Sequence, residues 1–513
     1  MAMPRQMQLK IAFCVLALYI SSMLIFEKGI EGTSRSLRSI FKIRRDLIDG
    51  GGGLITHTPP SWQKGTVPYT HEDVLRTQKV FGLPEYNVLM VFDGESGVFR
   101  TYGQRKDWNR NRASSVNFMI AQSLLANFPE RFHRGAPTCQ ILYNTNDYPT
   151  TDVRLLDFSS LPDDVGYAPV LQFGSVPREE ALLHPIPIKE MPFVRIMGCV
   201  IERPFPQINS WYCFFNEDTL SSLLNEPNTR SWEDMKSQIF WRGADYNFLN
   251  RLGDKTAGGA NFPIAYDDEK SVYKSLMAVW DKLAPRWKAV TLSLSAAMEA
   301  HQDNSETLPW IDAKFFNKNP LMKQRLVPFV DAGAEIATDQ FVTHEEQKDY
   351  KYHFDLGGGG GTSWTGTLSK LAMPGVLFHH ETITRDWFYD EMQPWVHYIP
   401  VKMDLSDLRE KFEWAEAHPA ECKAMSDAAS DFVRKMDSQE FMMEVYVKYL
   451  VERLGEVADA YRPGSETLES IIEDYEANGI QLEEYSTCDA QECFFPWKRG
   501  IGQAFQGVEV EES

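Results

Sequence analysis

The chain is 513 residues long, with 43% hydrophobic and 12% aromatic residues, so it can bury enough apolar surface for two folded domains plus appendages. Its formal net charge of -20 argues against nucleic-acid binding, because that function favours basic surfaces. None of the spacings between its 7 cysteines is that of a zinc site.

The cysteines outside the first apolar segment are even in number, which fits disulfides in an oxidising compartment. Cys488 and Cys493, close together near the C-terminus, are the pair that we expect to form a local bridge. Buried free thiols are the alternative for the others.

The first apolar segment, residues 11–26, reads IAFCVLALYISSMLIF and carries no charge. We expect a transmembrane signal anchor rather than a cleaved signal peptide, because no small-x-small cleavage site follows. More basic residues follow the segment than precede it, so the positive-inside rule alone predicts the opposite orientation to a lumenal body. Glycines at 50–53 and prolines at 59–60 are typical of a flexible stem.

The folded body is predicted to begin near Tyr86 as an α/β domain. Apolar residues recur at helical spacing over 115–128, which predicts a helix. We expect strands at 87–92, 140–144 and 168–173, with a polar loop at 145–152 after the second strand.

A second unit is predicted from Ser231, because Ser231 and Asp234 have the spacing of a helix N-cap. Arg242–Gly243 is expected to be a turn, and Gly357 to Gly361 a loop. The other elements expected here are strands at 238–241, 326–331, 350–356, 375–380 and 395–401, and helices at 369–373, from 404, and over 426–454.

The order strand, glycine loop, helix, strand is typical of the nucleotide-binding edge of a doubly wound sheet. Glycines let backbone N–H groups approach a phosphate closely, and the N-terminus of the following helix favours negative charge. A flexible loop without a ligand is the alternative.

Residues 350–408 contain YKYHFDLGGGGGTSWTGTLSKLAMPGVLFHH and then WFYDEMQPWVHYIPVKMDLSDL. This stretch closely resembles glycosyltransferase family 90, which includes protein O-glucosyltransferases, protein O-xylosyltransferases and fungal capsule-associated glycosyltransferases. PWVHYIPV at 394–401 is the most specific piece. FWRG at 240–243 and NDYP at 146–149 match upstream in the same order, so the likeness spans roughly residues 140–436.

The resemblance implies an α/β fold with two facing Rossmann-like domains, the GT-B type, behind the N-terminal anchor. It also implies an inverting glycosyltransferase that moves a sugar, glucose or xylose, from a UDP-sugar to a hydroxyl of a protein or glycan acceptor. The UDP-sugar is a co-substrate, and neither a cofactor nor a metal is expected.

Inverting transfer needs one base that takes the proton of the acceptor hydroxyl. The family match assigns this catalytic role to Asp147, with Asp152 as the fallback. A turn-forming aspartate before Tyr-Pro is the alternative for Asp147.

The departing diphosphate needs positive charge and N–H donors. Arg242 is the expected phosphate contact, since a guanidinium matches phosphate oxygens, and an arginine that ties a turn is the alternative. The other expected donor-side contacts are Gly358, Gly359, Gly360, Gly361, Thr362, Ser363, Thr367 and Lys370.

The sequence departs from the family at one donor-side position. The glucosyltransferase members carry an arginine where Gly366 or Thr367 stands here, and Lys370 is the expected substitute.

Three further residues are candidates for donor contact: Asp355 with hydroxyl groups, Trp364, and His397. Packing is the alternative for Trp364 and His397. His379 and His380 are interpreted as strand residues, because adjacent histidines are not spaced for a metal site.

Two other functions compete with the transferase. One is a catalytically inactive, lectin-like or scaffold member of the same fold, which the missing arginine favours. The other is a glycoside hydrolase, for which the sequence shows no motif for two facing carboxylates.

The chain is thus expected to be a single-pass type II protein of the Golgi or endoplasmic reticulum membrane, with a lumenal body. No endoplasmic-reticulum retrieval signal ends the sequence, which favours the Golgi. Its expected partners are the nucleotide sugar, the acceptor and, through the N-terminal helix, the membrane. The expected segments are a cytoplasmic tail at 1–10, the anchor at 11–26, a stem at 27–80, an N-terminal acceptor-side domain at 81–230, a C-terminal donor-binding domain at 231–425, a helical region at 426–463 and an acidic tail at 464–513.

Overall fold

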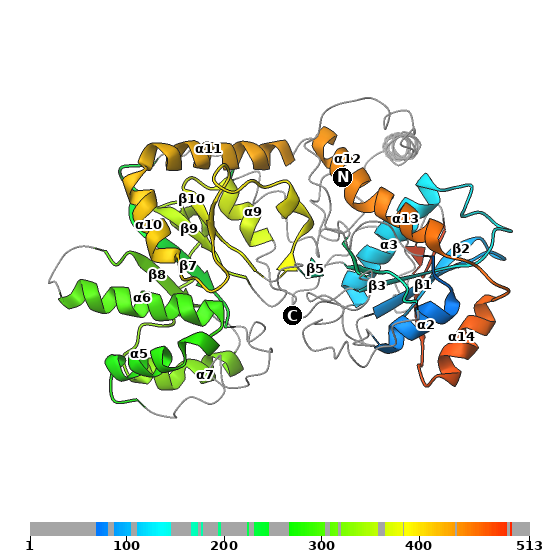
Figure 1. The fold of residues 1–513 in the computed structure, drawn as a ribbon, viewed down its shortest axis with the longest axis horizontal. Helices are drawn as coiled ribbons and strands as arrows, with labels where there is room; N and C mark the ends of the chain where they lie inside the picture. The colour runs from blue at the N-terminus through cyan, green and yellow to red at the C-terminus, as the bar shows by residue number, and fades with distance from the viewer. Residues whose placement is uncertain are drawn as a thin grey trace, which may run out of the picture.

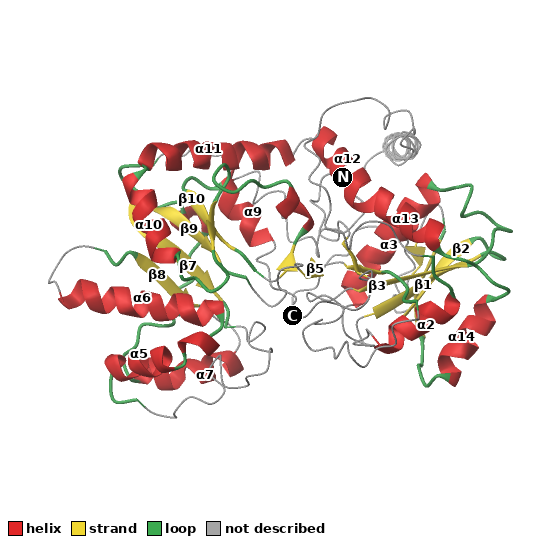
Figure 2. Ribbon diagram, viewed as in Figure 1, coloured by secondary structure: helices red, strands yellow, loops and turns green. Residues whose placement is uncertain are grey.

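Two large β-sheets organise the described parts of the chain, and they lie in different parts of the molecule (Figure 1). Helices accompany strands in both parts, so the mixed α/β class is confirmed (Figure 2). The computed structural model describes residues 68–80, 87–103, 110–144, 166–172, 176–177, 193–195, 223–224, 230–245, 266–302, 308–316, 320–357, 365–382, 384–436, 439–489 and 493–494.

The first sheet is mixed, in the order β14-β13-β2-β1-β3-β4-β6. Its strand β1 is an apolar run that is buried up to its last residue, as expected of a central strand covered on both faces. Helix α2 (His71–Val80) contacts β3, and α3 (Arg110–Asn127) contacts β13. The strands are β1 (Asn87–Asp93), β2 (Val98–Gly103), β3 (Cys139–Asn144), β4 (Val170–Gln172), β6 (Phe193–Arg195), β13 (Glu483–Cys488) and β14 (Cys493–Phe494).

The second sheet has five parallel strands in the order β12-β10-β9-β7-β8. They are β7 (Lys236–Gly243), β8 (Ile311–Phe315), β9 (Tyr350–Asp355), β10 (Val376–His380) and β12 (Ile399–Val401). Its helices are α5 (Glu269–Ala278), α6 (Pro285–Gln302), α7 (Pro320–Asp331), α8 (His344–Gln347), α9 (Thr365–Ala372) and α10 (Leu408–Ala417).

Helices cover both faces of this second sheet. In β10, Leu377 packs in one apolar core with α9, while its neighbours Val376 and Phe378 pack in the other core with α6 and α10. Figure 1 shows α9 and α11 on one side of the strands and α6 on the other. Because helices cover both faces, a ligand can approach the sheet at the ends of its parallel strands.

The C-terminal part of the chain returns to the first sheet (Figure 1). Helix α11 (Pro419–Met436) contacts α9 and β10, and then α12 (Gln439–Tyr446), a π-helical segment (Val447–Val451) and α13 (Glu452–Ala460) continue to α3 and β3. The helical character expected over 426–454 is therefore confirmed. The segment after it, expected to be partly irregular, contains α14 (Leu468–Ala477) and the strands β13 and β14.

A short ladder joins segments that follow strands of the two sheets. Strand β5 (Val176–Pro177), which follows β4, pairs with β11 (Thr384–Arg385), which follows β10. The carboxyl ends of β4 and β10 therefore lead to the same place, between the two sheets in Figure 1.

Cys488 is disulfide-bonded, and its register partner in the β13–β14 pair is Cys493, as the expected local bridge requires. Cys139 and Cys422 are buried free thiols, so the alternative holds for these two.

Four expected elements of the second unit differ from the structure. Residues 326–331 form the end of α7 instead of a strand, and the burial of Leu326 and Phe329 beside exposed Val327 and Val330 has helical spacing. Arg242–Gly243 is the end of β7 rather than a turn, since both residues pair with β8.

The expected helix at Ser231 is a single turn before β7, closed by a bond from the Asp234 amide to the Ser231 carbonyl. The strand expected over 395–401 begins only at Ile399, because Trp395 adopts a left-handed conformation (φ 63°).

The folded body starts earlier than the stem boundary at residue 80 implies. Tyr69 is buried, and its backbone pairs with Ala460 and Arg462. Helix α2 follows at once, with the Thr70 amide donating to the Asp73 carboxylate as in a capping turn.

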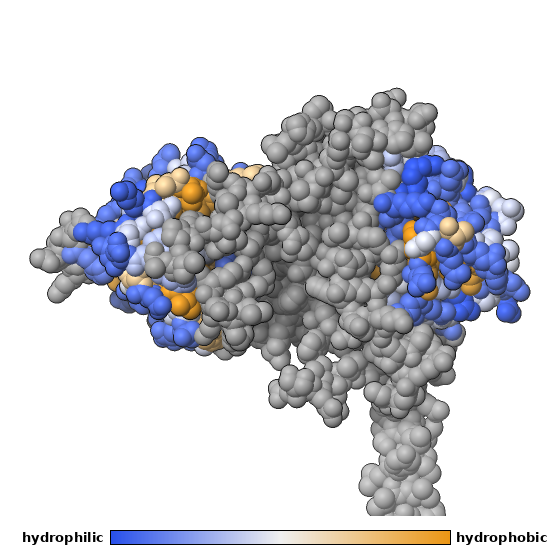
Figure 3. Space-filling view, turned by 90° about the horizontal axis from the view of Figure 1, so that it is seen from below, coloured by the Kyte–Doolittle hydropathy of each residue, from blue (hydrophilic) through white to orange (hydrophobic). Residues whose placement is uncertain are grey.

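The anchor expected at 11–26 lies outside the described residues. Among the residues that the structure describes, no helix combines the length and the apolar character that a membrane crossing needs. On the face drawn in Figure 3, the described surface is mostly hydrophilic, with small separate apolar patches.

A buried histidine in β9 predicts a pH dependence of stability. His353 is fully buried, its Nε2–H donates to the Pro374 carbonyl at 2.7 Å, and burial lowers its pKa to about 4. The unfolded chain, with an ordinary histidine pKa of about 6.5, takes up a proton at a higher pH than the folded chain does. We expect stability to fall by up to about 3 kcal/mol as the pH drops from about 6.5 to 4.

The measurement is urea unfolding at several pH values for the wild type and for His353→Gln, which keeps an N–H donor. The pH slope should become shallower in the variant, and an unchanged slope would contradict the assignment.

Candidate functional site at the switch point of the parallel sheet

The second sheet reverses its strand order between β7 and β9. The chain goes from β7 outward to β8 and then returns to the other side of β7 to form β9, β10 and β12. In open α/β sheets, ligands bind outside the carboxyl ends of the strands at such a reversal. The candidate site therefore lies where β7 ends at Gly243 and β9 ends at Asp355.

Arg286 joins the ends of these two strands. It lies in the first turn of α6 and is 9% exposed. Its nitrogens donate to the carbonyl of Ala244 after β7 (2.6 Å) and to the carbonyls of Leu356 (3.1 Å) and Gly357 (2.9 Å) after β9. The amide of Gly357 donates in turn to Nδ1 of His380 at 3.3 Å. The carbonyl and the amide of Gly357, the first residue of the glycine run, are thus both hydrogen-bonded.

Asp355, the last residue of β9, accepts two hydrogen bonds at one carboxylate oxygen. Thr367 Oγ1 donates at 2.6 Å and His379 Nδ1 at 2.8 Å, and the three side chains are at most 2% exposed. Burial alone raises the pKa of the Asp355 carboxyl, but the bond to His379 and its charge outweigh burial, so the pKa lies below its ordinary value. Asp355 is therefore a buried carboxylate, below the surface rather than on it.

Lys370 follows Thr367 by one turn of α9. Its ammonium donates to the Gly366 carbonyl at 3.2 Å, and no carboxylate among the described residues pairs with it. Burial lowers the pKa of Lys370, and the negative charge of Asp355 opposes that shift. The site thus offers one half-buried ammonium group with remaining donor capacity.

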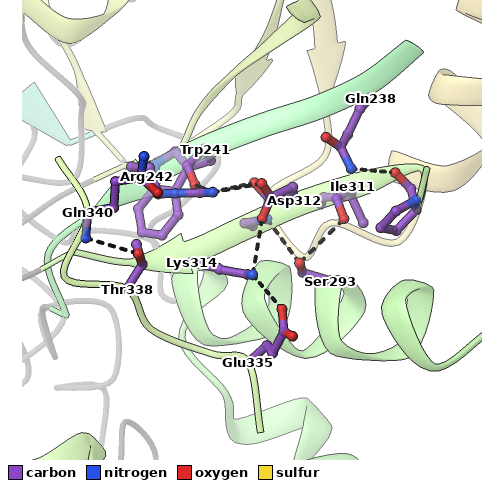
Figure 4. A network of polar contacts seen from close by, with 12 residues as sticks. Gln238, Trp241, Arg242, Ser293, Ile311, Asp312, Lys314, Glu335, Thr338 and Gln340 are labelled. Carbon is purple, nitrogen blue, oxygen red and sulfur yellow. Dashed lines mark hydrogen bonds and ion pairs between the residues drawn. The ribbon is translucent and has the colours of Figure 1, made fainter. Parts of the chain in front are cut away.

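Arg242 is engaged by an acidic partner instead (Figure 4). Its guanidinium donates to the Asp312 carboxylate at 2.7 Å and to the carbonyls of Asp312 and Trp241. It also lies over the Phe240 ring, and Lys314 and Glu335 extend the network. These contacts favour a structural arginine, as in the alternative that we left open, except that Arg242 ties strand β7 to β8 instead of tying a turn.

His397 lies away from these groups. Its ring stacks on Phe432 of α11, with centroids 4.9 Å apart, and Nδ1 accepts the Gln393 amide. This is the packing role that we gave as the alternative. His379 and His380 are strand residues, as interpreted. Each also makes a hydrogen bond at the site, His379 with Asp355 and His380 with the Gly357 amide.

The other predicted site residues cannot be placed. Asp147 and its fallback Asp152, and the donor-side candidates Gly358, Gly359, Gly360, Gly361, Thr362, Ser363 and Trp364, lie outside the described residues. Within the described part, no three histidine, cysteine, aspartate or glutamate side chains cluster as metal ligands.

Comparison with known proteins identifies a family for a region that contains this edge of the sheet. Residues 304–468 match the family model described as glycosyl transferase family 90. This region belongs to glycosyl transferase family 90. The family 90 region includes β9, the glycine run, α9 and β10, but it begins after β7 and Arg286.

Individual relatives match shorter stretches. Protein O-glucosyltransferase 2 of Danio rerio is 41% identical over 85 residues, 17% of this chain and 17% of the relative. Protein O-glucosyltransferase 1 of Homo sapiens is 32% identical over 109 residues, 20% of this chain and 27% of the relative. Uncharacterized protein 035R of Invertebrate iridescent virus 3 is 29% identical over 140 residues, 27% of this chain and 12% of the relative. The chain thus spans about a quarter or less of the length of these relatives.

Sequence reasoning missed Arg286 and the polar roles of His379 and His380. Arg286 precedes the family 90 region and belongs to no motif, so only the fold brings it to β9. A signal existed for the histidines, because polar residues at the carboxyl end of a buried parallel strand face the ligand edge of the sheet.

Proposed function

We propose that the chain is an inverting glycosyltransferase that moves a sugar, glucose or xylose, from a UDP-sugar to a hydroxyl of a protein or glycan acceptor. The observation that carries the proposal is the Lys370 ammonium, which pairs with no carboxylate among the described residues and lies beside the switch point of a sheet in a family 90 region. The relatives described above from Danio rerio and Homo sapiens are both named protein O-glucosyltransferase, which supports sugar transfer.

The proposed architecture is the GT-B type, with two facing Rossmann-like domains. Support comes from the two sheets and from the β5–β11 ladder, which brings together the segments after β4 and β10. Asn144 and Gln172, the last residues of β3 and β4, are register partners, so these two strands end at the same edge of the first sheet.

In the proposed reaction, Asp147 takes the proton of the acceptor hydroxyl as that oxygen attacks the anomeric carbon of the donor. The bond from the anomeric carbon to the diphosphate breaks, and UDP leaves. Lys370 and the backbone N–H groups of the glycine run stabilise its negative charge, with no metal ion required. Attack from the side opposite the leaving group inverts the anomeric configuration.

We further propose that residues 11–26 anchor the protein in the Golgi or endoplasmic reticulum membrane with a lumenal body. The support is the uncharged sequence of that segment and the secretory placement implied by the family resemblance. Protease-protection assays on membrane fractions test the orientation.

Equilibrium binding tests the proposal, with a panel of UDP-sugars, free UDP and ADP titrated into the purified protein. We expect UDP-glucose or UDP-xylose to bind and UDP to compete. Binding of ADP with equal affinity, or of no nucleotide, would contradict it.

Replacing Lys370 by Met should weaken UDP binding by roughly 10- to 100-fold, because a hydrogen bond to a charged group contributes about 1.5–3 kcal/mol. Isothermal titration calorimetry measures the change.

Lys370→Arg, which keeps the charge, should retain most of the affinity. Lys351→Met is the matched control. Lys351 is also a hydrogen-bonded lysine, but it lies near the start of β9 and not at its carboxyl end. If Arg242→Ala weakens UDP binding more than Lys370→Met does, the phosphate contact is Arg242.

A catalytically inactive binder is the second candidate. It is favoured by the absence of the arginine that the resemblance leads us to expect at Gly366 or Thr367, of which Thr367 is buried. Such a protein would bind a UDP-sugar and release no UDP from it.

A further inference from the structure

We propose that Asp355, Thr367 and His379 are positioning residues that hold helix α9, and with it Lys370, at the switch point. We refer to these three side chains as the staple. The inference rests on the proposed function, because it assigns the staple to the donor side of that reaction.

The staple joins three elements at one oxygen atom. Asp355 ends β9, Thr367 lies in the first turn of α9, and His379 is next to the last residue of β10. Both hydrogen bonds end on Asp355 Oδ2, and Asp355 and His379 are register partners in the parallel ladder. Because Lys370 lies one turn beyond Thr367, a shift of the first turn of α9 moves its ammonium by a similar amount.

Two aromatic rings limit the rotation of His379, the third residue of the staple. The His379 ring packs edge-on against Tyr389 (4.7 Å between centroids) and Tyr398 (4.9 Å). Tyr398 belongs to the PWVHYIPV segment, so this segment supports the staple through His379. A fixed imidazole fixes the Asp355 carboxylate, and the carboxylate fixes Thr367.

The burial of Asp355 argues against the hydroxyl contact that we expected from the sequence. Its second oxygen, Oδ1, is buried and has no hydrogen-bond partner. A buried unpaired carboxylate oxygen is costly, so packing alone does not explain the residue. Its charge acts on Lys370, however, because it favours the ammonium form without pairing with it.

Thr367 is, with Gly366, one of the two positions at which the family resemblance leads us to expect an arginine. The residue is 0% exposed and its hydroxyl is bonded to Asp355, so this position has no room for a long cationic side chain. The chain instead places a staple residue here and a cation one turn later.

The experiment compares Thr367→Val, which keeps the shape and removes the hydroxyl, with Thr367→Ser, which keeps the hydroxyl. We expect Thr367→Val to raise the Kd for UDP about tenfold, or about 1.4 kcal/mol, with kcat at saturating donor within about twofold of the wild type. Thr367→Ser should stay within about twofold of the wild type in both. Melting temperatures report whether each variant is folded.

A double-mutant cycle separates positioning from general destabilisation. If Thr367 acts through Lys370, the loss caused by Thr367→Val should disappear in a Lys370→Met background. An equal loss in both backgrounds, or a folded Thr367→Val protein with wild-type affinity, would overturn the staple while leaving the proposed function intact. Failure of the wild type to bind UDP would overturn both.

Discussion

Replacing Asp147 by Asn should slow sugar transfer by about 10²- to 10⁴-fold, the usual contribution of a general base. The amide keeps the size of the side chain but cannot take a proton from the acceptor hydroxyl. UDP affinity should stay within about twofold of the wild type, because the proposed phosphate contacts come from the second sheet. Steady-state transfer rates and calorimetric UDP binding on the same preparation measure the two effects.

Asp152→Asn is the matched control, since Asp152 lies in the same segment and is the fallback base. We expect it to change the rate by only a few fold. If the control variant loses transfer and Asp147→Asn does not, the base is Asp152. If neither loses transfer, the base comes from another part of the chain.

Arg286→Ala should be the most destabilising change at the site. It removes three hydrogen bonds from a charged donor and leaves the carbonyls of Ala244, Leu356 and Gly357 without it. Each bond of this kind contributes about 1.5–3 kcal/mol, and the effects of neighbouring bonds do not add fully. We expect the free energy of unfolding to fall by about 3–5 kcal/mol, measured by urea denaturation.

Arg409→Ala is the control for loss of an arginine. Arg409 pairs with Glu413 on the exposed surface of α10, and its removal should change stability by no more than about 0.5 kcal/mol. Arg286→Lys should recover only part of the loss, because an ammonium lacks the planar fork of the guanidinium. Equal stability of Arg286→Ala and Arg409→Ala would contradict the role of Arg286.

The core of the second sheet was predictable because its signals are local. β9 carries aromatic residues at alternate positions and β10 begins with three apolar residues, and a glycine run and a helical segment stand between the two strands. The apolar run at 326–331 was misread because periodicity alone does not separate a buried strand from a helix in so short a segment. Local patterns alone did not indicate the family, which was predicted from the resemblance of the motifs.

The site itself depends on tertiary pairing. Nothing local to β7 indicates that it lies between β8 and β9, yet this pairing creates the switch point. Arg286 reaches Gly357 across 71 positions of sequence, and the role of Arg242 depends on Asp312, which is 70 positions away. Lys370 was predicted as a substitute cation, whereas the staple beneath it required the register of β9 and β10.

Release of UDP from a panel of UDP-sugars by the purified protein tests the central claim most directly. The account predicts that UDP is released from UDP-glucose or UDP-xylose, and that Lys370→Met raises the donor concentration needed for half-maximal release. A folded protein that binds these donors and releases no UDP, with or without glycan and peptide acceptors, would contradict catalysis and favour the inactive binder.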